Sequence, residues 1–198
     1  MKPKFINVGE TFSDFKVYLP YATEDNFVRK KVYSSHQAFV HEVMIESLGE
    51  IQERLKETPY QLLILDAYRP FSIQEYFWSL CPDEGYLAKP IRDDQRNIVK
   101  GSNHNRGLAI DCTLTNRASE SWMPMPSGFD EFNEKAHRVW TNQKKKFLQD
   151  ENYKYAIELE EILEGQGFRG NPREWWHFDF VTHLEIDYVD LSFEELIS

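Results

Sequence analysis

The sequence predicts an α+β fold: a single domain with a central antiparallel sheet, flanking helices and a metal site on one sheet face. Three segments of helical periodicity and three short apolar runs of strand length support this class. Helix, strand and helix come first, and strands separated by loops follow, with one late helix. Because the 198 residues contain no repeat or linker and suffice for one core, we expect residues 1–198 to form one domain.

The first half of the chain gives a clear succession of elements. Apolar residues at helical spacing between positions 39 and 55 predict a helix that ends near Thr58, because the next residue is proline and disfavours helical backbone before it. The apolar residues 62–65 predict a buried strand. Pro70 is then well placed to begin a helix over residues 71–80.

The second half supplies the remaining elements. Residues 108–114 predict a second core strand. Apolar positions within residues 153–163 predict a helix, which we expect to stop at Gly165 or Gly167 because glycine commonly follows a helix end. Residues 177–181 alternate between polar and apolar side chains and predict a third core strand.

Charge and composition exclude several classes of partner. The chain has 33 acidic and 23 basic residues, a net charge of −10, which disfavours nucleic acid and anionic membranes. We expect the lysines at 144–146 to lie on a solvated face. Neither a signal-peptide pattern nor a run of transmembrane length is visible, so we expect a cytoplasmic protein. Cys81 and Cys112 form no disulfide framework, and Cys112 is expected to be a buried, inert thiol facing away from Asp111.

Two short motifs indicate metal chemistry. Residues 102–111 read SNHNRGLAID and residues 174–177 read EWWH. They offer His104, Asp111 and His177 as ligands, with a spare carboxylate at Glu174. A catalytic zinc site needs this set: three protein ligands, an open position for water and a general base beside it.

The local patterns explain how these side chains could converge. Gly107 lets the chain bend, or another group approach closely, between the first two ligands. In the predicted strand from His177, alternation places Asp179 on the same face as the histidine. Glu174 precedes this strand, close enough to reach a water held by the metal. Its expected role is to take the proton of that water and deliver it to the leaving amine.

The other histidines are interpreted as core or surface residues rather than ligands. His36 and His41 are predicted to lie on a helix, and five-residue spacing does not align them on one face. His137 and His183 have no metal-ligand pattern around them.

A resemblance narrows the chemistry. The pattern Ser-x-His-x-x-Gly-x-Ala-x-Asp followed by Glu-x-x-His resembles the D-alanyl-D-alanine metallopeptidase group, which also includes hedgehog-type domains. Residues 21–27 (YATEDNF), 66–70 (DAYRP) and 174–177 resemble signatures of the D-alanyl-D-alanine dipeptidases of the vancomycin-resistance type. The matches occur in family order from about residue 18 to residue 181.

The resemblance implies roles for eight residues. One zinc ion per chain would be held by His104, Asp111 and His177, with Glu174 as the catalytic base and Arg69 as the cation that steadies the oxyanion or the scissile carbonyl. Ser102 and Asp130 would hold the free ammonium of the substrate, and Tyr21 would line the pocket.

The chain also departs from the family pattern. Residues 123–128, before Asp130, are rebuilt with two prolines, and a stretch between Asp130 and Gly167 is longer than usual. Asn103 and Asn105 flank His104 where small residues are common. The zinc chemistry is expected to be intact, and the substrate preference is the property that these changes affect.

We therefore expect a zinc-dependent dipeptidase that hydrolyses D-alanyl-D-alanine or a similar small dipeptide, with a role in cell-wall peptidoglycan metabolism. Two alternatives stay open at this point: a D,D-carboxypeptidase or peptidoglycan endopeptidase of the same fold, and a non-catalytic zinc-binding module. Glu174 argues against the module, because a structural site needs no spare base.

Overall fold

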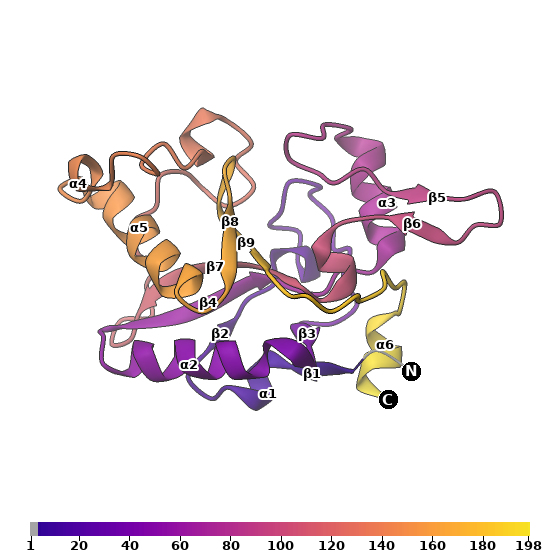
Figure 1. Cartoon of the computed structure of the whole chain (residues 1–198), viewed down its shortest axis with the longest axis horizontal. Helices are drawn as coiled ribbons and strands as arrows, with labels where there is room; N and C mark the ends of the chain where they lie inside the picture. Colours follow the sequence, from indigo (N-terminus) through magenta and orange to yellow (C-terminus); the bar gives the residue numbers. More distant parts are fainter. Residues whose placement is uncertain (1–3) are drawn as a thin grey trace.

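A five-stranded sheet forms the centre of the computed structural model, which describes residues 4–198 (Figure 1). Its spatial order is β2 (Lys16–Val17), β4 (Tyr60–Asp66), β7 (Ala109–Asn116), β9 (Glu174–Phe180) and β8 (Phe168–Asn171). All neighbouring pairs are antiparallel except β2 and β4, which are parallel. The predicted α+β class is confirmed, and the two-residue edge strand makes the sheet mixed.

Two helices cover one face of this sheet. Helix α2 (Ile45–Lys56) packs on β4, and α5 (Glu151–Glu164) packs on β7, β8 and β9. The two helices also contact each other, so they lie on the same face. Ile110 and Phe178 are register partners, and Phe178 is fully buried. Asp111 and His177 are also partners, and alternation turns them to the opposite face.

Most predicted elements are present. Helix α3 (Phe71–Leu80) has the predicted bounds and begins directly after Pro70. Helix α5 ends at Glu164 with Gly165 as its C-cap, as expected. Its N-terminus is capped by Asp150, whose side chain accepts from the backbone of Asn152.

The first predicted helix is wrong at its start. Residues 39–41 form strand β3 (Phe39–His41), which pairs with β1 (Phe5–Asn7), and a 3-10 turn (Glu42–Met44) precedes α2. Phe39 and Val40 are buried, as a helix would also require, so their spacing suits both structures. The pairing with β1 decides between them, and neither His36 nor His41 lies on a helix.

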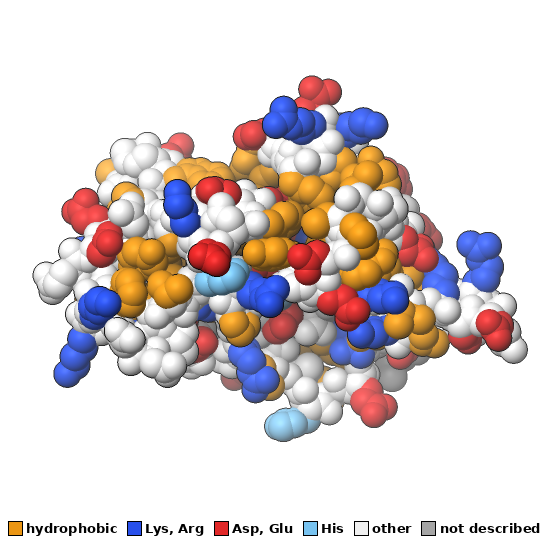
Figure 2. Space-filling view, turned by 90° about the horizontal axis from the view of Figure 1, so that it is seen from above, with side chains coloured by type: hydrophobic (Ala, Val, Ile, Leu, Met, Phe, Trp, Pro, Cys, Tyr) orange, Lys and Arg blue, Asp and Glu red, His pale blue; other side chains and the backbone are white. Residues whose placement is uncertain are grey.

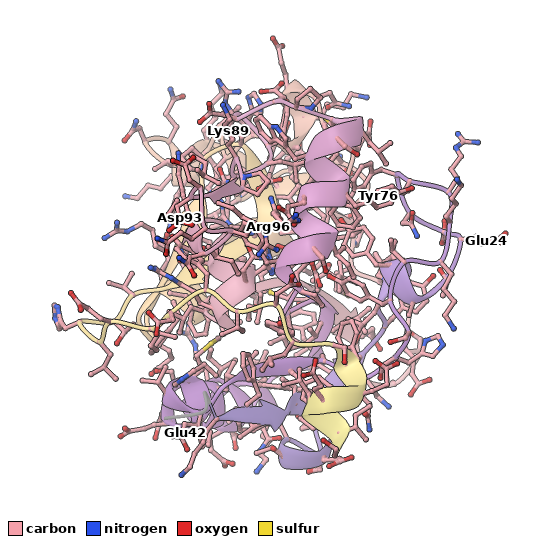
Figure 3. The ribbon with its side chains drawn as sticks, turned by 90° about the vertical axis from the view of Figure 1, so that its right-hand side faces the viewer. Glu24, Glu42, Tyr76, Lys89, Asp93 and Arg96 are labelled. Atoms are coloured by element: carbon pink, nitrogen blue, oxygen red, sulfur yellow. The ribbon has the colours of Figure 1, made fainter. Side chains whose placement is uncertain are left out.

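The remaining elements are short and surround the sheet. They are α1 (Val8–Thr11), α4 (Lys144–Phe147), α6 (Phe193–Ile197), β5 (Ile91–Arg92), β6 (Ile98–Lys100) and the 3-10 turns Pro20–Ala22, Asn103–Arg106 and Glu134–Ala136. The β5–β6 hairpin projects from the body of the molecule (Figure 1). Figure 3 labels Asp93 and Arg96 of this hairpin, which lie on the same side of the molecule as α3. Arg92 ties it to α3 by donating to Glu75 at 2.9 Å.

Strand β9 carries an irregularity that matters for the site. Gly170 of β8 pairs with Phe178 of β9, but the next residue of β8, Asn171, pairs with Glu174. One step along β8 thus corresponds to four residues along β9. Residues 175–177 therefore have no partners on β8, and we call them the β9 bulge. Such extra residues re-aim side chains, because they break the strict alternation of faces.

Three further expectations can be compared with the structure. Cys112 is fully buried, and it follows Asp111 on β7 with its side chain on the opposite face, as expected. Lys145 and Lys146 are exposed, but Lys144 lies 2.8 Å from the buried carboxylate of Glu160, so a solvated face is wrong for Lys144. Among residues 4–198, no helix is long and apolar enough to cross a membrane.

Candidate active site

The three expected metal ligands converge. Nδ1 of His177 lies 2.9 Å from Oδ1 of Asp111 and 3.1 Å from Nε2 of His104, and the latter is 3.4 Å from the same Asp111 oxygen. Ligand atoms about 2.0–2.1 Å from a tetrahedral zinc ion would be separated by about 3.3 Å. Two imidazole nitrogens and a carboxylate oxygen at these separations fit a zinc ion without rearrangement of the chain.

Local sequence holds His104 in place. Ser102 and Asn105 form a capping box around the 3-10 turn that carries the histidine, so Asn105 has a structural role here. Gly107 ends this turn at φ +67°, and a Cβ there would lie 2.8 Å from the backbone nitrogen of His41. Both expectations for Gly107, a bend and a close approach, are confirmed.

Each imidazole is oriented by a hydrogen bond on the nitrogen that faces away from the ligand cluster. Nδ1 of His104 donates to the carbonyl of Ala67 at 2.6 Å, and Nε2 of His177 donates to Asp179 at 3.0 Å. These bonds favour the tautomers that leave Nε2 of His104 and Nδ1 of His177 free to coordinate a metal ion. The face shared by His177 and Asp179 was expected from strand alternation, and it is present.

The carboxylates and imidazoles of the ligand cluster shift one another's pKa values. Burial opposes a charged His177, but hydrogen bonds to Asp111 and Asp179 outweigh it and raise the pKa of this imidazole well above its usual range. Burial likewise opposes an ionised Asp111, but the two histidines hold the pKa of this carboxyl well below its usual range. Asp111 is therefore ionised at neutral pH, as a metal ligand must be.

Glu174 is the first residue of β9 rather than preceding the strand, and the β9 bulge explains how it reaches the site. Strict alternation would put Glu174 and His177 on opposite faces, yet both line one cavity. The Glu174 side chain is 6% exposed and accepts a 2.6 Å hydrogen bond from Nδ2 of Asn171. Burial raises the pKa of Glu174 to about 7, which suits a group that exchanges protons near neutrality.

Arg69 is held rigidly behind the ligands. Its Nε and Nη2 donate to Asp66 at 3.1 and 2.6 Å, and Nη1 donates to Gln74 at 2.8 Å. Of the five N–H groups of a guanidinium, two are thus not used by any hydrogen bond within residues 4–198. Nη2 lies 4.0 Å from Oδ2 of Asp111, so the guanidinium is beside the metal ligands.

Tyr21 and Asp130 meet at another wall of the same cavity. The Tyr21 hydroxyl donates to Oδ2 of Asp130 at 2.7 Å. Burial raises the pKa of Asp130 well above its usual range, and the hydrogen bond from Tyr21 opposes this. Asp130 adopts φ +55°, a conformation that L residues rarely take, so the loop holds this side chain at a conformational cost. Ser102 also lines the cavity, although its hydroxyl already accepts from the backbone of His104 at 3.3 Å.

The cavity that these residues share has a volume of about 360 Å³. All eight sequence-predicted site residues line it: Tyr21, Arg69, Ser102, His104, Asp111, Asp130, Glu174 and His177. Residues 84–88 and aromatic side chains such as Trp176 complete the wall. On the molecular face seen in Figure 2, hydrophobic side chains are exposed between acidic and basic ones.

Two imidazoles, a carboxylate and a separate buried carboxylate in one cavity on an α+β sheet define a metallopeptidase class of site. Residues 1–196 match the model of the peptidase family described as D-Ala-D-Ala dipeptidase, and the chain belongs to this family, Peptidase_M15. The resemblance seen in the motifs is thereby confirmed, and the chain is a metallo-dipeptidase by family.

Named relatives agree with this family. The chain is 31% identical to a D-alanyl-D-alanine dipeptidase of Escherichia coli over 176 residues, which cover 89% of this chain and 84% of the relative. It is 31% identical to the enzyme of the same name from Enterococcus faecium over 87% of this chain and 92% of the relative. The corresponding protein of Enterococcus faecalis is 28% identical over the full length of both chains.

Sequence reasoning did not assign the residues that orient the site. Asp66 and Gln74 hold Arg69, Asp179 holds His177 and Asn171 holds Glu174. Two of these residues carried a usable signal: Asp179 shares a strand face with His177, and Asp66 belongs to the DAYRP motif that contains Arg69. Asn171 reaches Glu174 across the β8–β9 turn, and nothing in its sequence context indicates that contact.

Proposed function

We propose that this chain hydrolyses D-alanyl-D-alanine, or a similar small dipeptide, with one zinc ion held by His104, Asp111 and His177. One observation carries the proposal: the cavity that contains the ligand cluster is also lined by the buried carboxylate of Glu174 and the half-buried carboxylate of Asp130. Its volume, about 360 Å³, is at the small end of ligand pockets, which span roughly 300–1,000 Å³, and this suits a dipeptide.

A zinc ion and two side chains, Glu174 and Arg69, would divide the chemistry. A bound zinc ion would supply a Lewis acid for the scissile carbonyl and an acidified water. Glu174 takes a proton from the attacking water and returns it to the amine that leaves, so no net proton is consumed by the residue. The two N–H groups of Arg69 that are not used by Asp66 or Gln74 are directed at the negative charge that develops on the carbonyl oxygen.

Asp130 gives the site its preference for a free amino terminus. Asp130 has lost part of its hydration in the cavity. The positive charge of a substrate ammonium would compensate for this loss and favour the ionised form of the Asp130 carboxyl. Tyr21 keeps one carboxylate oxygen fixed by its 2.7 Å hydrogen bond, and Ser102 lines the same cavity as a further polar contact. The alternative, a D,D-carboxypeptidase or endopeptidase, acts on longer peptides. Its site would need space for the residues that precede the dipeptide, at the position that Asp130 and Tyr21 occupy here.

The test is direct. Purified protein is stripped of metal, reloaded with zinc and assayed for release of D-alanine from D-Ala-D-Ala, with L-Ala-L-Ala as the matched substrate. We expect activity that is lost on chelation, restored by about one zinc per chain and selective for the D,D isomer. Failure of zinc-loaded protein to cleave the D,D dipeptide would overturn the proposed substrate. Zinc binding at a site other than the three ligands would overturn the metal assignment.

A further inference from the structure

Arg138 lies directly behind the β9 bulge, on the sheet face away from the cavity. Its Nη2 donates to the carbonyl oxygens of Trp175 and His177, at 2.9 and 3.2 Å. Its Nε donates to the carbonyl of Asn171 at 2.8 Å, and its backbone nitrogen donates to the carbonyl of Pro172 at 3.0 Å. One arginine thus binds the hairpin that carries Glu174 and His177 at four carbonyl groups.

The remaining nitrogen of this guanidinium is anchored to α5. Nη1 of Arg138 lies 2.7 Å from Oε2 of Glu160, which also accepts from Nε1 of Trp140 at 3.0 Å. The other oxygen of Glu160 lies 2.8 Å from Nζ of Lys144. Arg138 is 7% exposed and Glu160 3% exposed, so this is a buried and fully partnered ion pair.

The guanidinium packs closely against β8 and β9. Its Cζ lies 4.3 Å from the centre of the Phe178 ring. A Cβ added at Gly170 would lie 2.3 Å from the same carbon, so only glycine fits on that strand. Phe178 is fully buried and is the residue after the bulge. The arginine therefore fills the space that regular β8–β9 pairing would otherwise occupy.

The bulge creates a need that Arg138 meets. Residues 175–177 lack partners on β8, so the carbonyls of Trp175 and His177 would be buried without a donor. A planar guanidinium can satisfy both with a single nitrogen and still reach Asn171 and Glu160, which a lysine ammonium cannot do. Arg138 does not line the cavity, so it acts on the site only through the backbone that it holds.

We propose that Arg138, anchored by Glu160, is a positioning residue that fixes the β9 bulge and so sets the places of Glu174 and His177 relative to each other. The part of this proposal that concerns turnover rests on the proposed dipeptidase function. The part that concerns His177 as a ligand can be measured without any substrate.

Arg138→Lys is the first test. This variant keeps a positive charge beside Glu160 but loses the guanidinium that donates to the carbonyl groups of the β9 bulge. We expect zinc affinity and kcat to fall by about 10–100-fold each, as is typical when groups that orient metal ligands are removed, while KM changes much less. A cobalt-substituted protein should show altered visible bands, because these report the position of His177 around the metal.

Arg117→Lys is the matched control. Arg117 also pairs with an aspartate, Asp14, and donates to two backbone carbonyls, those of Leu55 and Tyr60, at 3.2 and 2.9 Å. It does not line the cavity. This variant should lower the melting temperature while zinc affinity, kcat and the cobalt spectrum stay unchanged. An Arg138→Lys protein that behaves in the same way would overturn the proposal and leave Arg138 a purely structural residue.

Gly170→Ala tests the same idea with every hydrogen-bonding group retained. Its methyl group displaces the guanidinium, so zinc affinity should fall and the cobalt bands should shift as in Arg138→Lys. If Arg138→Lys does not fold, this variant decides, and a normal zinc affinity and spectrum would overturn the proposal. Absence of D-Ala-D-Ala cleavage in the unmodified protein would refute the proposed substrate instead, because the two metal readouts do not involve it.

Discussion

The Tyr21 hydroxyl donates a 2.7 Å hydrogen bond to Oδ2 of Asp130, across 109 positions of the chain. The Tyr21 ring is fixed by aromatic packing, with its centre 4.8 Å from that of Phe77. A rigid donor thus holds one oxygen of a half-buried carboxylate and leaves the other oxygen for a ligand. This pair unites two residues that the motifs singled out separately.

Tyr21→Phe is expected to weaken substrate binding with little loss of stability, because the ring packing is retained. A hydrogen bond to a charged group contributes about 1.5–3 kcal/mol, so kcat/KM for D-Ala-D-Ala should fall by roughly 10–100-fold, mainly through KM. Steady-state kinetics and a melting curve measure the two effects. An unchanged KM would show that Asp130 needs no fixed partner.

Glu174→Ala is expected to separate metal binding from chemistry. Zinc content should stay near one ion per chain, since Glu174 is not among the three converging ligands. Turnover should fall by about 10²–10⁴-fold, the usual contribution of a general base. Metal analysis and kcat on the same preparation test this. Near-normal turnover would assign the base to another residue.

Arg69→Ala should lower both turnover and stability. Asp66 is fully buried and would lose its cation, and breaking a buried ion pair costs about 3–5 kcal/mol. Arg69→Lys should rescue turnover poorly, because one ammonium cannot bind Asp66 and Gln74 in the same geometry and still face the substrate. Zinc content, kcat and the free energy of unfolding distinguish these effects. Full activity of Arg69→Lys would show that the planar guanidinium of Arg69 is not required for turnover.

Asn171→Ala should move the acidic limb of the pH profile to higher pH. Glu174 acts as a base only when ionised, so kcat/KM falls as pH drops through its pKa. Burial raises the pKa of Glu174 to about 7, and the Asn171 hydrogen bond opposes that rise. A bound cation lowers the pKa in both proteins, so the comparison is of two zinc-loaded profiles. Loss of the donor should shift the limb upward by about one unit. A shift to lower pH would contradict the assignment.

The sequence was most informative about helix ends, where proline and glycine have strong positional preferences. Pro70 marked the start of α3 to the residue, and the end of α5 at Gly165 is one of the two glycine positions that the sequence offered. His104, Asp111 and His177 were predicted as ligands because the two motifs occur together, and the structure brings the three side chains within reach of one metal ion. The resemblance then placed Arg69 and Asp130 near them, and the structure puts them in the same cavity.

What the sequence did not indicate depends on contacts with backbone atoms or on tertiary competition. Phe39 and Val40 suit a helix as well as a strand, and only pairing with β1 selects β3. Arg138 binds backbone carbonyl groups, which every residue possesses. No pattern of side chains in the sequence therefore indicates its role. The β9 bulge is similarly invisible, because alternation around His177 continues through Phe178 and Asp179 without any glycine to mark the break.

The preference for a free amino terminus gives the last prediction. We expect D-Ala-D-Ala to be cleaved far better than N-acetyl-D-Ala-D-Ala or a muramyl-type pentapeptide, because acylation removes the charge that Asp130 would hold. A site built around a polar group of the substrate discriminates strongly, up to about 10⁴–10⁵-fold, against analogues that lack it. Values of kcat/KM for the three substrates measure this directly.

Asp130→Asn is the matched variant, since it keeps the shape and can still accept from Tyr21. It should narrow the gap between free and acetylated dipeptide, mainly by weakening the free one. The rebuilt residues 123–128 lead into Asp130, and Trp175 from the β9 bulge donates to Ser127 within this segment at 3.0 Å. This contact holds the loop that positions the carboxylate. Equal cleavage of blocked and free substrates by the unmodified protein would instead favour the D,D-carboxypeptidase alternative, with the pocket open beyond Asp130.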